Sequence, residues 1–179
     1  ILTASIYGVD LDPGAVEVTQ LSLYLKMLEG ESRATLAKNR ELFGPDAPLL
    51  PPLQNNVKCG NSLIASDFSV NPDDLTRVRA FDWDEGFRDI MKSGGFDVVV
   101  GNPPYIPIET MDEPDRKYYQ QTYPQVSRKF DTGIIFILQA LRLVKSTGLV
   151  GYISSITWET GENFAKLRQT MFLQHGVVE

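Results

Sequence analysis

The chain has 179 residues, enough for one domain with a sizeable core, and its 42% hydrophobic and 22% charged residues are typical of a globular protein. Its longest apolar run, 134–138, is too short to cross a membrane, and the single cysteine, Cys59, excludes an internal disulfide and offers no basis for a metal site, which fits a reducing cytosol. The net charge of −6 argues against a chain that holds nucleic acid by electrostatics alone, because phosphate binding needs a basic face.

The first half of the chain predicts two strands separated by a helix. The expected elements are a strand at 5–10, a helix at 13–28, a loop at 44–56, a short strand at 57–59 with a turn at 60–61, and a helix within 74–93. Asp12 followed by Pro13 is typical of a helix start, since aspartate caps the first turn and proline fits the first helical position. The helix expected within 74–93 ends at Gly94-Gly95, because glycine readily adopts the left-handed conformation that terminates helices.

The second half continues the alternation of strands and helices. The expected elements are a strand at 96–101, an irregular polar segment at 106–130, a helix over 132–146, a strand at 149–154, a helix at 162–174, and the start of a strand at 177–178. Asp131 caps the helix over 132–146, with Lys145 in its last turn and Gly148 beyond it. Strands alternating with helices predict an α/β fold with a mostly parallel sheet.

One tetrapeptide carries the main chemical signal. The β-branched run at 96–101 predicts a buried parallel strand, whose following loop lies at the carboxyl edge of the sheet, where α/β proteins bind ligands. Asn102 offers a side-chain carbonyl, and Pro103 offers a backbone carbonyl whose position it and Pro104 help to fix. Tyr105 adds a flat ring against which a planar group can stack.

These groups suit the activation of a conjugated amine. The lone pair of an exocyclic amine such as adenine N6 is delocalised into its ring, so the nitrogen is a poor nucleophile. Two acceptors that bind both N–H groups pull the nitrogen towards tetrahedral geometry and return electron density to it. Preorganised acceptors and alignment with a sulfonium methyl group then lower the barrier without a strong base.

The tetrapeptide and its setting resemble a known family. Asn-Pro-Pro-Tyr after such a strand is the catalytic motif of amino methyltransferases, and the stretch 106–158 is similar to the methylase region of type II restriction-modification enzymes and gamma-class adenine methylases. The resemblance implies a Rossmann-like, S-adenosylmethionine-dependent methyltransferase fold that flips an adenine out of DNA and methylates N6. In that family Asn102, Pro103 and Pro104 form the catalytic loop, and Tyr105 stacks on the base.

The resemblance also implies the residues that hold the cofactor. Asp10 matches the acidic residue that binds the ribose hydroxyls, and Leu11 beside it packs on the cofactor adenine. From the residues alone, Asp10 is more often a capping residue before a helix. Asn61, with Ser62 beside it, falls where the family often has an aspartate that contacts the cofactor's amino group, and an ordinary turn asparagine is the alternative.

Two further assignments have alternatives of comparable weight. Phe164 matches an aromatic residue that stacks on the flipped base, yet with Leu167 and Met171 it also forms a helical apolar stripe typical of a core. Basic residues alternate with tyrosines over 116–129 and suit a groove for a nucleic-acid strand. Acidic residues just before them cancel the charge, which favours a solvated loop.

The resemblance implies a chain truncated at its N-terminus. The acidic residue of such folds lies about twenty residues after a glycine-rich turn, but here it is Asp10, and no glycines form G-x-G. We therefore expect a partial catalytic domain over 1–179 whose first strand lies upstream. The unpaired sheet edges would favour self-association, and the isolated chain should be inactive.

The expected partner is double-stranded DNA, contacted through the full-length enzyme. No association with a membrane is expected. Two other functions remain open. An amino methyltransferase of RNA or of protein glutamine would share the tetrapeptide, but should lack the match at 131–164. The other alternative is a nucleotide-binding or interaction module without catalysis. Asn-Pro-Pro-Tyr argues against it, because simple binding does not explain this motif.

Overall fold

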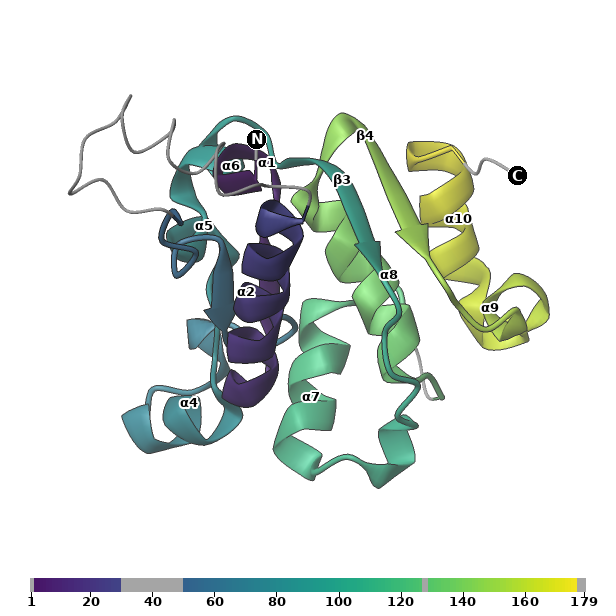
Figure 1. Ribbon diagram of the computed structural model, residues 1–179. Helices are drawn as coiled ribbons and strands as arrows, with labels where there is room; N and C mark the ends of the chain where they lie inside the picture. Colours follow the sequence, from purple (N-terminus) through teal and green to yellow (C-terminus); the bar gives the residue numbers. More distant parts are fainter. Residues whose placement is uncertain (1, 30–49, 127–128, 177–179) are drawn as a thin grey trace, which may run out of the picture. The chain divides into compact units, whose positions relative to one another are not determined.

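The computed structural model describes residues 2–29, 50–126 and 129–176 (Figure 1). The chain divides into two compact units, residues 1–81 and residues 82–179, and each contains one pair of parallel strands with helices. The parallel direction of both pairs confirms the prediction of an α/β fold. Across the described ranges, no helix is long and apolar enough to span a membrane.

The first unit is built on the parallel pair β1–β2. Its elements are α1 (Leu2–Ser5), β1 (Gly8–Asp10), α2 (Pro13–Leu28), β2 (Val57–Cys59), η1 (Ser66–Phe68) and α4 (Pro72–Val78). Helix α2 has the predicted bounds, and the side chain of Asp12 accepts a hydrogen bond from the Gly14 amide at 2.8 Å. The strand predicted at 5–10 is too long. The side-chain amide of the buried Asn56 donates to the carbonyl oxygens of Thr3 in α1 and of Ile6 just after it, and the strand begins only at Gly8.

The helix predicted within 74–93 is wrong as a single element. Helix α4 ends where Arg79 adopts a left-handed backbone with φ of 52°, and Ala80 then pairs with Asn61 in an isolated bridge. Phe81 packs so closely on Gly60 that a Cβ there would lie 2.7 Å from the Phe81 Cβ. These tertiary contacts override the local preference for helix.

The second unit is built on the parallel pair β3–β4, with α8 packed against both strands (Figure 1). Its elements are α5 (Trp83–Gly86), α6 (Arg88–Lys92), β3 (Phe96–Gly101), η2 (Ile108–Thr110), α7 (Glu113–Thr122), α8 (Thr132–Leu143), β4 (Val144–Tyr152), α9 (Thr157–Thr160), η3 (Glu162–Phe164) and α10 (Ala165–Gln174). Strand β3 has the predicted bounds. The turn before it uses positive φ angles at Gly94 and Gly95, as expected. The strand start predicted at 177–178 lies outside the described residues.

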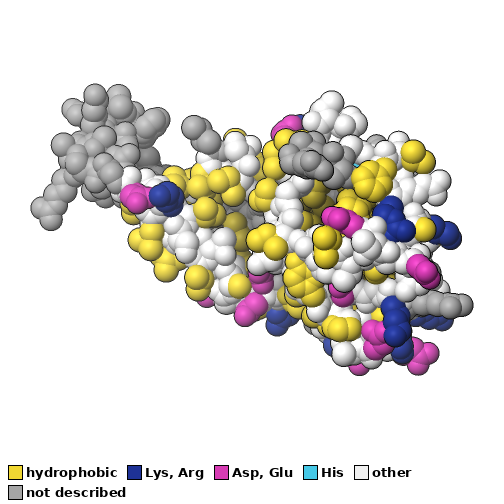
Figure 2. All heavy atoms as spheres, turned by 90° about the vertical axis from the view of Figure 1, so that its right-hand side faces the viewer, with side chains coloured by type: hydrophobic (Ala, Val, Ile, Leu, Met, Phe, Trp, Pro, Cys, Tyr) yellow, Lys and Arg dark blue, Asp and Glu magenta, His cyan; other side chains and the backbone are white. Residues whose placement is uncertain are grey.

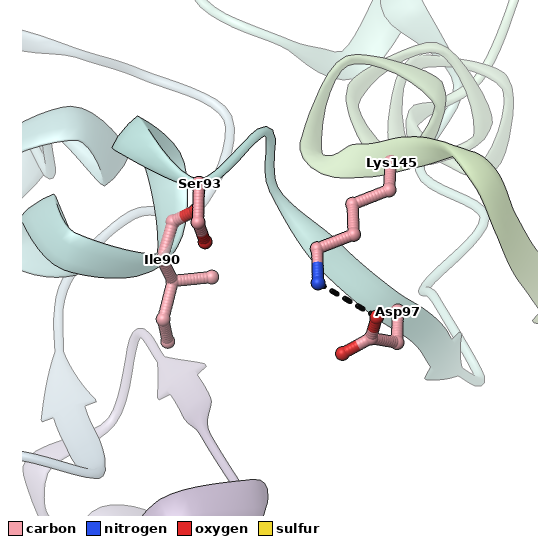
Figure 3. Close-up of polar contacts among 4 residues, drawn as sticks. All are labelled: Ile90, Ser93, Asp97 and Lys145. Atoms are coloured by element: carbon pink, nitrogen blue, oxygen red, sulfur yellow. Dashed lines mark hydrogen bonds and ion pairs between the residues drawn. The ribbon is translucent and has the colours of Figure 1, made fainter.

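The helix over 132–146 and the strand at 149–154 were placed with the wrong boundary. Asp131 caps α8 as predicted, accepting from the Ile134 amide at 3.2 Å, but β4 begins earlier and includes Lys145 and Gly148. The Lys145 ammonium lies 2.7 Å from the carboxylate of Asp97 on β3 (Figure 3). Residues from Val144 onwards therefore pair with β3 and do not continue the helix, although the sequence pattern favours a longer helix.

The segment 106–130 is not irregular, because it contains helix α7. The missed signal is Asp112 before Pro114, which together mark a helix start. Tyr118 and Tyr119 of this helix are buried, and the Tyr123 hydroxyl donates to Gln139 Oε1 at 2.8 Å. The tyrosines therefore pack in the interior of the unit and offer no stacking surface to a nucleic-acid strand.

One face of the β3–β4 pair remains open and apolar. Val98 and Val100 are 54% and 74% exposed, and the register places Leu149 directly beside Val98. Because side chains alternate along a strand, these residues share one face, while the half-buried Val99 points to the other. Figure 2 shows hydrophobic side chains at the surface, with acidic and basic side chains intermixed on the face presented.

Candidate active site

The Asn-Pro-Pro-Tyr tetrapeptide begins directly at the carboxyl end of β3, as the sequence predicts. The Asn102 side chain is exposed, whereas Pro103 is buried. The Ile153 amide donates to the Gly101 carbonyl oxygen at 3.3 Å, so backbone hydrogen bonding between the strands extends to the residue before Asn102. The Asn102 side-chain amide is therefore exposed to solvent, directly after a residue whose backbone is held by hydrogen bonding.

The far end of the tetrapeptide is bound to the start of α8. The buried Thr132 hydroxyl donates to the Pro104 carbonyl oxygen and accepts from the Ile106 amide, the latter at 3.0 Å. The Thr132 amide also donates to the Ile106 carbonyl oxygen at 3.0 Å. One threonine therefore binds three backbone groups of the loop and fixes its path.

Tyr105 is held at both its ring and its hydroxyl. The hydroxyl donates to the Ile153 carbonyl oxygen at 2.6 Å, just past the end of β4. The ring lies against Gly133, where a Cβ would be 2.8 Å from Tyr105 Cδ1. The side chain is still 43% exposed, so a constrained ring keeps an open surface for stacking.

A second tyrosine lies at the base of the tetrapeptide. The ring of Tyr152 lies over Gly101, where a Cβ would be 3.0 Å from Tyr152 Cε1. Burial raises the pKa of the Tyr152 phenol, so the neutral form of this group is favoured.

In the first unit, the four predicted cofactor residues meet at one sheet edge. Asp10 ends β1 and Leu11 follows it, while Asn61 and Ser62 come just after β2, and the two strands are parallel with Asp10 opposite Cys59. The Gly60 amide donates to the Asp10 carbonyl oxygen at 2.9 Å and joins the two strand ends. Their adjacency follows from the parallel pairing.

The side chains at this edge have local roles as well. Asp10 Oδ1 accepts from the Asp12 amide at 2.8 Å, and Asn61 Oδ1 accepts from the Leu63 amide at 3.0 Å, as in an ordinary asparagine turn. A carboxylate has further lone pairs, so the exposed Asp10 can still accept from a ribose diol. Leu11 is 52% exposed and offers an apolar surface beside it. The residues present therefore fit a nucleoside.

Arg79 is a structural part of this edge that the sequence does not mark. Its guanidinium donates to the Leu11 carbonyl oxygen, and its own carbonyl oxygen accepts from the Asn61 amide at 2.6 Å. Arg79 thus joins the loop after β1 to the loop after β2, at the position with left-handed φ. Nothing local to residues 74–93 predicts this, because the partners are distant in sequence.

The structure favours the packing role of Phe164. Its side chain is only 9% exposed, and Leu167 of the same stripe is fully buried. A Cβ on Gly161 would lie 2.9 Å from the Phe164 ring, so the ring fills the turn between α9 and α10. A role in base stacking remains a prediction and would need this ring to become accessible.

Comparison with known proteins gives consistent matches. The Eco57I restriction-modification methylase family matches residues 4–179. The type II restriction enzyme and methyltransferase RM.Eco57I of Escherichia coli is 36% identical over 156 residues, which cover 86% of this chain and 14% of that protein. The adenine-specific methyltransferase PglX of Streptomyces coelicolor is 27% identical over 186 residues, 94% of this chain and 14% of that protein. The chain therefore spans a small part of the length of both relatives.

Proposed function

Because the chain belongs to the Eco57I restriction-modification methylase family, we propose that it supplies catalytic residues for methylation of adenine N6 in double-stranded DNA. The parent protein would act at specific sites as part of a restriction-modification system. Residues 1–179 would belong to a methyltransferase domain, to which we assign the Rossmann-like fold. The mixed α/β arrangement with parallel strands supports this assignment.

One observation carries the proposal: Asn102 is an exposed amide at the carboxyl end of a parallel strand, followed by a backbone fixed by Thr132. An amide oxygen and the Pro103 carbonyl together can accept both N–H groups of the target amine. The backbone that carries them is held by β3 and by Thr132 before the substrate arrives, which limits the reorganisation that opposes the development of charge on the nitrogen.

Tyr105 would stack on the flipped adenine. Its hydroxyl already donates to the Ile153 carbonyl oxygen, so the residue offers its ring and not a proton. A base extruded from a duplex loses its stacking partners, and an aromatic surface replaces part of that energy. The exposed fraction of the ring supports this role.

Asp10, Leu11, Asn61 and Ser62 would hold the nucleoside part of S-adenosylmethionine. Asp10 would accept from the ribose hydroxyls, Leu11 would contact the adenine, and Asn61 with Ser62 would contact the adenine edge. The cofactor supplies an electrophilic methyl group on a sulfonium, which needs only an activated amine and alignment. The carboxylate beside an apolar surface supports this choice.

DNA is the proposed partner because of the family and the relatives. The net charge of −6 means that phosphate contacts are concentrated locally or come from other parts of the whole protein. An RNA or protein-glutamine substrate has no specific observation in its favour. The names of the matched relatives mention restriction enzymes and adenine-specific methyltransferases.

The proposal is tested with Asn102→Ala in the full-length enzyme. Loss of a preorganised acceptor should reduce kcat about 10²- to 10³-fold, while the Kd for DNA changes little. Transfer of labelled methyl groups to adenine N6 of duplex DNA measures kcat, and fluorescence anisotropy of a labelled duplex measures the Kd. Asn71→Ala is the matched control, because Asn71 caps α4 and has no proposed catalytic contact. A parent enzyme that labels no adenine, or an Asn102→Ala enzyme with wild-type kcat, contradicts the proposal.

A further inference from the structure

The tetrapeptide contains more acceptors than the target amine requires. The Asn102 side chain, the Pro103 backbone and the Pro104 backbone each carry a carbonyl oxygen, whereas an amine has two N–H donors. The Thr132 hydroxyl donates to the Pro104 oxygen. The Asn102 amide and the Pro103 carbonyl, the pair proposed for the target amine, take no part in this hydrogen bond.

The same hydrogen bond also constrains the carbonyl groups before it. Proline fixes φ at both Pro103 and Pro104, so few rotations remain between the two carbonyl groups. Fixing the Pro104 oxygen on Thr132, with β3 fixing the chain before Asn102, therefore limits the directions that the Pro103 oxygen can take.

The Thr132 hydroxyl has no evident task in the helix that it begins. Asp131 caps α8 by accepting from the Ile134 amide. The Thr132 hydroxyl binds the loop instead, since it donates to the Pro104 oxygen and accepts from the Ile106 amide. The residue is 6% exposed, so water does not readily replace these bonds if the hydroxyl is removed.

We propose that Thr132 is a positioning residue for methyl transfer: its hydroxyl holds the Pro104 carbonyl and thereby sets where Asn102 and Pro103 meet the target amine. This inference rests on the proposed function. It assigns Thr132 no contact with substrate or cofactor, and the effect acts through the loop.

The test compares Thr132→Val with Thr132→Ser in the full-length enzyme, because valine keeps the shape and removes the hydroxyl whereas serine keeps the hydroxyl. Thr110→Val is the matched control. Its hydroxyl also donates to a proline carbonyl, that of Pro107, at 2.7 Å, but in an exposed turn outside the tetrapeptide. Thermal melting shows whether each variant is folded, and single-turnover methylation of duplex DNA, with enzyme in excess, gives a rate constant that reports alignment.

We expect Thr132→Val to lower the single-turnover rate constant about 100-fold, the size expected for a misplacement of roughly 1 Å, at a DNA Kd close to wild type. The rate constants of Thr132→Ser and Thr110→Val should stay within about threefold of wild type, because both variants keep a hydroxyl at position 132. A Thr132→Val enzyme whose rate constant is unchanged, even with a lower melting temperature, shows a structural role only and overturns the inference. Equal losses in Thr132→Val and Thr132→Ser also overturn it. A wild-type enzyme that methylates no adenine refutes the proposed function, and this inference with it.

Discussion

At the scale of single residues, the two aromatic residues assigned to the target base differ in their surroundings. Tyr105 is 43% exposed and held by its hydroxyl, whereas Phe164 is 9% exposed and packed on Gly161. An exposed constrained ring suits stacking on a base, and a buried ring suits a core. The two residues should therefore respond differently to truncation.

Phe164→Ala should lower the free energy of unfolding by about 3–5 kcal/mol through loss of buried surface and formation of a cavity. The fluorescence of 2-aminopurine at the target position should remain, because we propose Tyr105 as the residue on which the flipped base stacks. Thermal melting and this fluorescence measure the two effects separately. Phe172→Ala is the control, since Phe172 lies on the same helix α10 and is 58% exposed. Loss of the flipped-base signal without a change in melting temperature would instead establish Phe164 as a base contact.

The predictable part of the site is the part encoded by neighbouring residues. Asn102 could be found because a β-branched strand and the tetrapeptide adjoin in sequence, and the structure places it at the carboxyl end of that strand. Thr132 and Arg79 could not be found in this way. Their partners lie 28 and 68 residues away, so only the folded chain brings them together.

At the scale of elements, the local signals were strongest where a cap or a β-branched run was present. Helix α2 and strand β3 have the predicted bounds for this reason. The predicted helix within 74–93 breaks because contacts of Phe81 with Gly60 determine the backbone there. Helix α7 was missed because its tyrosines and charges suggested a solvated segment, although the tyrosines are buried.

Helix α7 carries a pH-dependent contribution to stability. Burial, with the carboxylate of Asp115 adding to it, raises the pKa of the Tyr119 phenol well above its ordinary value. The folded state therefore favours the neutral phenol. This contribution is fully present below the unfolded pKa of about 10 and is lost as pH rises above it.

Tyr119→Phe should therefore weaken the fall in stability between about pH 9 and about pH 11.5, because phenylalanine has no proton to lose. Urea unfolding at a series of pH values measures the slope. The Tyr152 phenol, whose pKa is also raised by burial, remains in the variant, so the slope should decrease without vanishing. An identical slope in both proteins would show that Tyr119 does not ionise with unfolding.

At the scale of the whole molecule, the strand pairs have open sides. Within the ranges 2–29, 50–126 and 129–176, β1 pairs only with β2, and β3 pairs only with β4. The open face of the second pair carries exposed valines, and unpaired strand edges with apolar side chains favour association with another chain.

We expect residues 1–179, expressed alone, to self-associate with increasing concentration, as measured by light scattering. Val98→Thr combined with Val100→Thr should reduce this association, since threonine retains the strand preference and adds a hydroxyl. Val70→Thr is the matched control, because Val70 is fully exposed outside both strand pairs. A monomeric wild-type chain, or equal association in all three proteins, would show that this face does not drive contact.

The anchors of the tetrapeptide also have a consequence for biosynthesis. The Tyr105 hydroxyl binds a carbonyl oxygen 48 residues downstream, and the Pro104 carbonyl binds a hydroxyl 28 residues downstream. A ribosome therefore releases the tetrapeptide well before the residues that give it shape, and closing these long segments costs entropy. The loop can reach its final geometry only after residue 153 has emerged, so Asn102 reaches its final position late in the folding of this unit. In hydrogen exchange during refolding, the Ile106 amide should gain protection together with α8 and not with β3.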